Sequence, residues 1–174
     1  MKKSILITGG TRSGKSAIAE RLATKLGAQP VYIATAKAFD AEMTARIDAH
    51  VARRGPEWTT LQVDLDLASA LDATDTGQPR LVDCLTLWLT NLMLAGDDIV
   101  GRTSDLIRAL KRQNGPVVFV TNEVGSGIVP DSKLGRDFRD AAGALNQQIA
   151  AECTEVYLAV SGQALKVKPN DIDF

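Results

Sequence analysis

The segment Gly9–Ser16, with the sequence GGTRSGKS, has residue types and spacing that suit a phosphate group. It fits the pattern GxxxxGK[ST], directly after the apolar run Ser4–Thr8 and directly before a helical stretch. Lys15 would reach the terminal phosphates of a nucleoside triphosphate, and the Ser16 hydroxyl would bind Mg²⁺. The alternative is a glycine-rich turn with a chance Lys-Ser, which the strand–loop–helix context disfavours. The predicted nucleotide contacts here are Gly9, Gly10, Thr11, Arg12, Ser13, Gly14, Lys15 and Ser16.

A phosphate loop of this kind needs a carboxylate on the magnesium side. Asp83 ends the apolar run Leu81-Val82, where the carboxyl end of a parallel strand is expected and where ligands collect in open α/β sheets. Asp83 is therefore the predicted metal-side acid. A second interpretation remains open, in which Asp83 caps the helix that starts at Leu85.

The only histidine of the chain, His50, lies on a predicted helix at Ala41–Arg54. Arg46 and Arg54 are four residues away on either side and share its stripe at helical spacing. Two guanidinium groups disfavour protonation of the imidazole, which keeps it a neutral nucleophile that can attack phosphorus. The alternative is a basic, solvated helix face that happens to carry one histidine.

Strand-like and helix-like runs alternate along the chain and must position these residues. Continuous apolar runs are typical of parallel strands covered on both faces, and helices supply the crossovers between them. The sequence predicts a P-loop NTPase-like α/β fold, an open, mostly parallel sheet with helices on both faces. The predicted strands are Ser4–Thr8, Val31–Ala34, Leu81–Val82, Val117–Thr121 and Val156–Val160. The predicted helices are Ser16–Leu26, Ala41–Arg54, Leu85–Leu94, Ser104–Gln113 and Leu134–Glu152.

Three loops and one edge strand complete this prediction. The loops are expected at Gly55-Pro56, Asp72–Pro79 and Gly125–Ser132, where glycine, proline and short polar residues gather. The segment Ala164–Lys168 is expected to form an edge strand. No composition shift marks a boundary, so residues 1–174 are expected to form a single domain.

The composition excludes several classes of protein. Lys and Arg number 20 and Asp and Glu 21, for a net charge of −1, which argues against a protein that grips a nucleic acid backbone. Cys84 and Cys153 have no partners at metal-ligand spacing, which argues against a zinc site or a disulfide framework and favours a cytoplasmic protein. The apolar N-terminal run is too short for stable membrane insertion.

Further segments carry a likeness to a known family. They are YIATA (Tyr32–Ala36), RIDAHVARR (Arg46–Arg54) followed by Trp58, DCLTLWLTNL (Asp83–Leu92), TNEVGSGIVP (Thr121–Pro130), FRDAAGALNQ (Phe138–Gln147) and VYLAVSG (Val156–Gly162). Together with GGTRSGKS, the chain resembles the bifunctional adenosylcobinamide kinase / adenosylcobinamide-phosphate guanylyltransferase family of cobalamin biosynthesis. The segments occur in the family's order and cover nearly the whole chain.

The resemblance implies two activities on one scaffold. A nucleoside triphosphate would phosphorylate the hydroxyl of the aminopropanol arm of adenosylcobinamide. GMP would then pass from GTP to that phosphate through a guanylylated histidine, which matches His50, giving adenosylcobinamide-GDP and pyrophosphate. The implied substrates are GTP, ATP and the corrinoid, with Mg²⁺ as cofactor and a homotrimer as the assembly.

The resemblance also implies nucleotide contacts beyond the phosphate loop. Asp83 matches the acidic Walker B-like position and would bind the metal with Ser16. Gln62 stands where the family has a carboxylate, and it carries no charge. If that carboxylate accepts from the N–H groups of guanine, selectivity for the base is expected to be weaker here. The remaining implied contacts are Ala34, Thr35, Ala36, Val51, Ala52, Arg53 and Arg54.

Two other interpretations of function remain open at this point. One is a small-molecule kinase that uses only the phosphate loop and has no need of His50. The other is a nucleotide-dependent switch with little turnover. Glu123, after the strand Val117–Thr121, is a candidate base for the kinase step, and its alternative role is to hold nearby backbone N–H groups.

Overall fold

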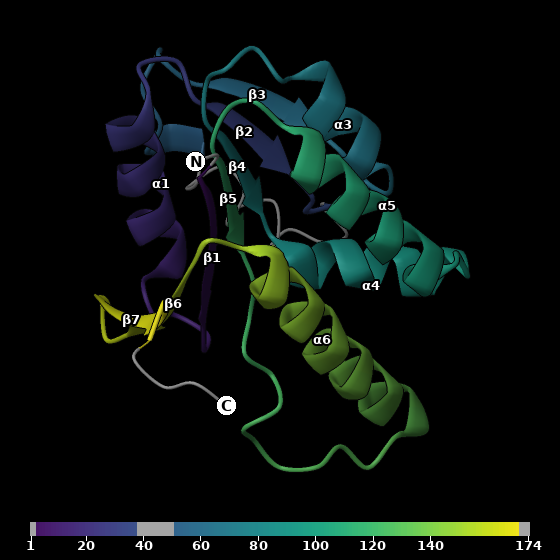
Figure 1. Cartoon of the computed structure of the whole chain (residues 1–174). Coiled ribbons are helices and arrows are strands. Elements are labelled where there is room, and N and C mark those ends of the chain that lie inside the picture. Colours follow the sequence, from purple (N-terminus) through teal and green to yellow (C-terminus); the bar gives the residue numbers. More distant parts are fainter. Residues whose placement is uncertain (1–2, 38–50, 171–174) are drawn as a thin grey trace.

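The computed structural model describes residues 3–37 and 51–170, where the chain forms a seven-stranded sheet in the order β3-β2-β4-β5-β1-β6-β7. In this order, each strand from β3 across to β6 is parallel to its neighbour, and only the last pair, β6 with β7, is antiparallel. His50, Arg46 and most of the predicted helix at Ala41–Arg54 lie outside the described residues. The predicted open, mostly parallel sheet is confirmed (Figure 1).

The bounds of the elements agree closely with most of the predictions. The strands are β1 (Ser4–Gly9), β2 (Val31–Ala34), β3 (Thr59–Gln62), β4 (Arg80–Asp83), β5 (Val117–Val120), β6 (Glu155–Val160) and β7 (Gln163–Lys168). The helices are α1 (Lys15–Leu26), α3 (Leu67–Ala73), α4 (Leu85–Ala95), α5 (Ile99–Arg112) and α6 (Lys133–Glu152). The expected edge strand is therefore present as β7.

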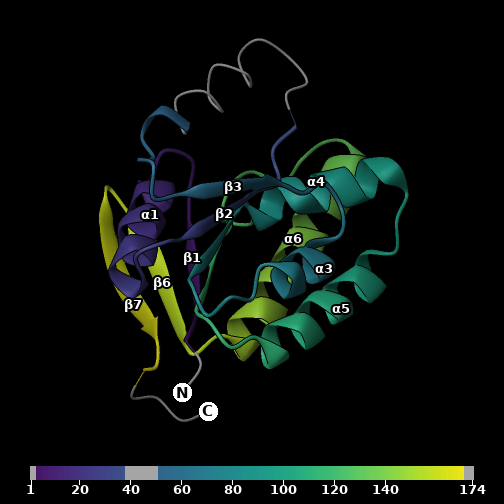
Figure 2. The same cartoon turned by 90° about the horizontal axis from the view of Figure 1, so that it is seen from above.

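Helices cover both faces of the sheet, as the apolar strands require. On β1, Ile5 and Ile7 pack with α1 on one face, while Leu6 packs on the other face with α3, α4, α5 and α6. This division follows from the two-residue period of a strand. Figure 2 shows α1 alone on its side and the other labelled helices on the opposite side. Trp88 and Phe119 anchor the larger cluster and are almost completely buried.

The order of the strands brings the expected functional residues to one edge. The chain leaves β1 toward β2 on one side, and the later strand β6 adds to the other side of β1. Ligands bind at such a switch point, outside the carboxyl ends of the strands. The loop after β1, the end of β2 and the end of β4 all lie at this edge, since these strands are parallel.

Five details of local structure differ from the predictions. Strand β3 and helix α3 were not predicted, because the β3 residues are exposed at the sheet edge and α3 has only seven residues. The expected loop at Asp72–Pro79 begins later, since α3 continues to Ala73. Helix α5 starts at Ile99 rather than Ser104, because the Asp98 carboxylate accepts a hydrogen bond from the Gly101 N–H and caps it. Arg53 and Arg54 lie in a turn instead of a helix.

Two further expectations concern the cysteines and the membrane. Cys84 and Cys153 are buried and free. Within residues 3–37 and 51–170, no helix combines the length and the apolar character that crossing a bilayer requires.

Trp88 is expected to be the most sensitive position of the core. Its side chain is 1% exposed, and its indole N–H donates to the Leu65 carbonyl at 2.7 Å. Trp88→Ala is expected to lower the free energy of unfolding by about 3–5 kcal/mol in urea denaturation. Leu94→Ala on the same helix is the control, because Leu94 is 69% exposed, and its change should stay within about 0.5 kcal/mol. Equal losses in the two variants would contradict this assignment of the core.

Candidate nucleotide site

The loop between β1 and α1 has the conformation that its glycines allow. Gly14 is the N-cap of α1 and has a positive φ of 92°, which glycine adopts without strain. No side chain caps the start of α1, and the amide groups of an uncapped first turn suit an anion. The phosphate-binding geometry predicted for Gly9–Ser16 is thus compatible with the backbone seen here.

Close packing also requires glycine in this loop. A Cβ atom on Gly9 would lie 2.5 Å from the carbonyl oxygen of Ala159, and one on Gly14 would lie 3.0 Å from Cα of Gly162. The Gly162 N–H donates to the carbonyl of Ser13 at 2.9 Å. The loop therefore rests against the turn between β6 and β7, which fixes it from outside the motif.

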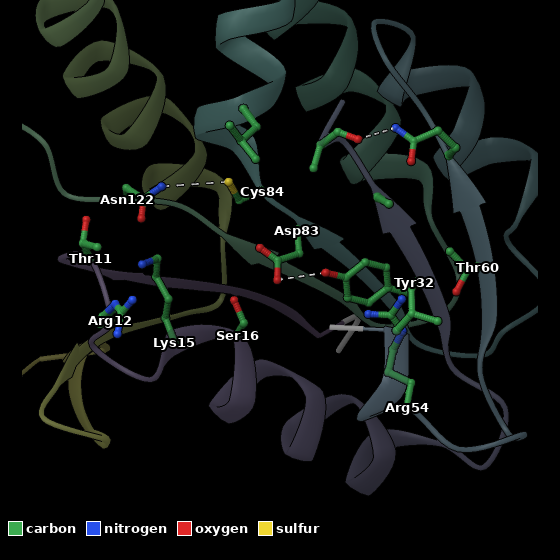
Figure 3. A pocket seen from close by; sticks show the side chains of 15 residues that line it. Thr11, Arg12, Lys15, Ser16, Tyr32, Arg54, Thr60, Asp83, Cys84 and Asn122 are labelled. Carbon is green, nitrogen blue, oxygen red and sulfur yellow. Dashed lines mark hydrogen bonds between the residues drawn. The ribbon is translucent and has the colours of Figure 1, made fainter. Parts of the chain in front are cut away.

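A cavity of about 530 Å³ opens beside this loop. Figure 3 shows side chains from the loop, β2, β4 and the segment before β3 pointing into it. Ten predicted contacts line it: Thr11, Arg12, Lys15, Ser16, Ala34, Ala36, Val51, Arg54, Gln62 and Asp83. Residues from distant parts of the sequence, chosen on different grounds, thus share one cavity.

Lys15, Ser16 and Asp83 face the cavity from α1 and β4 (Figure 3). The Lys15 ammonium donates to the Gly10 carbonyl at 2.9 Å, which holds it along the loop. The Asp83 carboxylate accepts from the Tyr32 hydroxyl at 3.1 Å. Helix α4 begins at Leu85 without a side-chain cap, so the interpretation of Asp83 as a helix cap is wrong.

The donor atoms around Ser16 and Asp83 fit magnesium. A hydroxyl and a carboxylate are hard oxygen donors, and Mg²⁺ is usually held by one or two such groups together with phosphates and water. In the described part of the chain, no group of three or more His, Cys, Asp or Glu side chains lies close enough to hold a metal.

An aromatic cluster forms the wall opposite the phosphate loop. The Arg54 guanidinium lies 3.6 Å from the centre of the Tyr32 ring, and the Trp58 ring meets Tyr32 edge-on at 6.1 Å. One terminal nitrogen of Arg54, Nη1, is buried and has no hydrogen-bond partner among residues 3–37 and 51–170. Burial, and then the Asp83 charge, raise the pKa of Tyr32, so its hydroxyl stays a donor.

Gln62 presents an acceptor to the cavity. Its side-chain amide donates to the Ala36 carbonyl at 2.9 Å and to the Asp64 carboxylate at 3.3 Å. Hydrogen bonds from Lys37, and then from Gln62, hold the pKa of Asp64 below its usual range. With both amide protons engaged, the carbonyl oxygen of Gln62 is left as an acceptor.

Several predicted contacts do not line the cavity with their side chains. Arg53 forms an ion pair with Glu20 at 3.1 Å, and Ala52 is exposed. Gly9, Gly10, Ser13 and Gly14 belong to the loop and shape its backbone without lining the cavity. The Glu123 carboxylate accepts from the Gly125 N–H at 2.8 Å. This hydrogen bond matches the alternative role expected for Glu123, that of holding backbone N–H groups of its own loop.

Thr35 is completely buried and joins the ends of β2 and β4. Its hydroxyl donates to the Cys84 carbonyl at 2.7 Å and accepts from the Cys84 N–H at 2.8 Å. Thr35→Val is expected to cost about 2–4 kcal/mol of unfolding free energy, because two buried backbone groups lose their partner. Urea denaturation would measure it. Thr35→Ser keeps the hydroxyl and should lower the free energy of unfolding much less. An equal loss in both variants would assign the effect to the methyl group of Thr35.

Five residues of the cavity were not predicted: Tyr32, Thr60, Cys84, Leu87 and Asn122. Asn122 lies two residues after the end of β5 and Cys84 directly follows β4, so the rule that strand ends gather at one edge would have found both. Tyr32 and Thr60 are register partners on β2 and β3. No sequence signal could have found them together, because β3 was not predicted.

Curated relatives match almost the whole chain. A family model described as cobinamide kinase / cobinamide phosphate guanyltransferase matches residues 5–167. The bifunctional adenosylcobalamin biosynthesis protein CobP of Pseudomonas aeruginosa is 46% identical over 166 residues, covering 94% of this chain and 96% of that protein. The corresponding protein CobU of Escherichia coli is 42% identical over 180 residues, covering 94% and 99%.

Solved structures of low identity share the fold. A prototypical ATPase of the type III secretion system of pathogenic bacteria has a TM-score of 0.61 and 11% identity, covering 94% of this chain and 56% of that one. The P4 protein from bacteriophage phi6 in complex with ADP has a TM-score of 0.50 and 17% identity, covering 93% and 52%. This chain spans about half the length of each of them. The P-loop NTPase fold is confirmed.

Proposed function

This chain belongs to the cobinamide kinase / cobinamide phosphate guanyltransferase family, and we propose that it transfers the guanylyl group through a covalent intermediate on His50. The enzyme is bifunctional, and the names of its relatives state the same of them. The proposal concerns how one nucleotide cavity serves both reactions and which residues carry them.

In the kinase step, the hydroxyl oxygen of adenosylcobinamide attacks the γ-phosphorus of a nucleoside triphosphate. The bond from that phosphorus to the bridging oxygen breaks, a nucleoside diphosphate leaves, and the proton of the hydroxyl passes to water. The loop amides and Lys15 hold the phosphates and stabilise the charge that develops on the leaving group. Thr11, Arg12 and Asn122 line the same end of the cavity and are available to the phosphates or the alcohol.

In the guanylyl step, a neutral imidazole nitrogen of His50 attacks the α-phosphorus of GTP and pyrophosphate leaves. A phosphate oxygen of adenosylcobinamide phosphate then attacks the same phosphorus and breaks the P–N bond, which frees His50. The loop and Lys15 stabilise pyrophosphate as they stabilise the diphosphate in the kinase step. Arg54 would steady the α-phosphate from the opposite wall.

Ser16 and Asp83 would hold Mg²⁺, which neutralises phosphate charge when bound. Gln62 and Ala36 lie at the β2–β3 end of the cavity, where the Gln62 carbonyl would accept from an N–H group of guanine. This placement sets the base and the terminal phosphates at different ends of one cavity.

The observation that carries the proposal is the shared cavity. Lys15 and Asp83 line it together with Val51 and Arg54, and His50 directly precedes Val51 in the chain. A kinase that used only the phosphate loop would have no need of this second wall. A switch protein would bind nucleotide without forming a covalent adduct.

Labelling of the protein tests the proposal. The enzyme is incubated with Mg²⁺ and GTP labelled with ³²P at the α-phosphate, then denatured. A label on the chain that is labile in acid and stable in alkali indicates a phosphoramidate, and adding adenosylcobinamide phosphate should remove it. GTP labelled at the γ-phosphate is the control and should leave no label. Normal GTP binding with no α-label would favour the kinase or the switch instead.

A homotrimer and a cytoplasmic location belong to the same proposal. Exposed apolar side chains gather around the start of α6, where Ile128 is 96% and Leu134 is 64% exposed, and covering them would favour association. Buried, free cysteines suit a reducing compartment. Sedimentation equilibrium would measure the assembly.

A further inference from the structure

The geometry points to Tyr32 as a positioning residue that holds both Asp83 and Arg54, two charged groups that line the cavity. Tyr32 is not among the nucleotide contacts expected from the sequence. The inference rests on the proposed function, because it takes this cavity as the site of GTP.

The hydroxyl of Tyr32 fixes the carboxylate of Asp83. Tyr32 lies on β2, next to β4, and its hydroxyl donates to Oδ2 of Asp83, the last residue of β4, at 3.1 Å. The tyrosine is only 5% exposed. A hydrogen bond to a charged group is strong where water cannot replace it. The carboxylate is therefore held in one orientation before any ligand arrives.

The ring of Tyr32 supports Arg54. The guanidinium carbon lies 3.6 Å from the ring centre, within the range of a cation–π contact, and the Trp58 ring packs against Tyr32 in a T-shaped arrangement. Among the residues that the structure describes, no ion pair holds Arg54, and its Nη1 atom is buried without an acceptor. A buried N–H group without a partner is costly. The group therefore suits an acceptor that a ligand brings, and a phosphate oxygen matches a guanidinium best.

The two contacts use different parts of one side chain, so two substitutions separate them. Tyr32→Phe removes the hydroxyl from Asp83 and keeps the ring under Arg54. Tyr32→Leu removes both. Tyr157→Phe is the matched control, because the hydroxyl of Tyr157 also donates to a carboxylate, that of Glu155 at 2.6 Å, and Tyr157 does not line the cavity.

The test is binding of GTP by calorimetry, with EDTA and with Mg²⁺, in addition to the kinase rate. Tyr32→Phe is expected to reduce the gain in affinity that Mg²⁺ brings by about tenfold, while the metal-free affinity changes much less. Tyr32→Leu is expected to lower the metal-free affinity by about fivefold as well. If the leucine variant does not fold, Arg54→Lys replaces it, because lysine keeps the charge and loses the planar stack.

A purely structural tyrosine would lower the melting temperature and leave both affinities as in Tyr157→Phe, which would overturn the inference. An Asp83→Asn background provides a second check, since Tyr32→Phe should then have no further effect on the Mg²⁺ gain. The covalent label from GTP labelled at the α-phosphate is also measured on the wild-type enzyme that is used for calorimetry. A missing label with normal GTP binding overturns the histidine step alone, while a normal label with unaffected Tyr32 variants overturns only the role of Tyr32.

Discussion

His50→Asn is expected to abolish guanylyl transfer and to leave the kinase reaction nearly intact. An asparagine amide has no nucleophilic lone pair comparable to that of a neutral imidazole, so no phosphoramidate forms at this position. The rate of adenosylcobinamide-GDP formation from adenosylcobinamide phosphate should fall by on the order of 10³-fold or more. The kinase rate should change less than about threefold, because its nucleophile is the substrate hydroxyl.

Both rates can be measured on one preparation, with the covalent label as an independent readout. His50 is the single histidine in the sequence, so loss of an acid-labile label in this variant assigns the adduct without mapping. Arg53→Gln is a matched control nearby in the chain, since Arg53 pairs with Glu20 outside the cavity, and it should keep the label. Unchanged guanylyl transfer in His50→Asn would rule out the histidine step and leave a kinase.

Lys15→Met is expected to reduce both reactions. The Lys15 side chain lines the cavity with its ammonium held on the Gly10 carbonyl at 2.9 Å. In each step, negative charge grows on a phosphate leaving group, and removing one charged donor from such a site costs about 100- to 1000-fold in rate. Methionine keeps the length and apolar character of the stem, so the loss would report the charge.

The controls for Lys15 test whether one phosphate site serves both steps. Lys25→Met, in the exposed last turn of the same helix, should change either rate less than about twofold. Thermal unfolding of both variants would exclude a folding defect. If Lys15→Met lost only the kinase activity, GTP would bind elsewhere for guanylyl transfer. The two variants therefore distinguish one shared cavity from two separate sites. With one cavity, Lys15→Met slows both reactions and His50→Asn slows only guanylyl transfer.

Most of the strands, most of the helices between them and the phosphate loop could be predicted from the sequence. These depend on local patterns: β1 and β5 are continuous apolar runs, and Gly14, Lys15 and Ser16 stand at fixed spacing between a strand and a helix. Because parallel strands end at one edge, the position of Asp83 after β4 could also be predicted. The family resemblance added the residues around Val51 and Arg54, which no pattern of spacing alone would have placed in the site.

How those groups are held depends on contacts that form only when the chain has folded. Strand β3 is exposed and polar enough to escape prediction, and it forms by pairing with β2. That pairing brings Thr60 and Gln62 to the cavity and places Trp58 against Tyr32. The contacts of Tyr32 with Asp83 and Arg54 join residues up to 51 positions apart, and sequence spacing carries no information about such pairs. Side-chain direction across neighbouring strands is set by their register, which exists only once the sheet has formed.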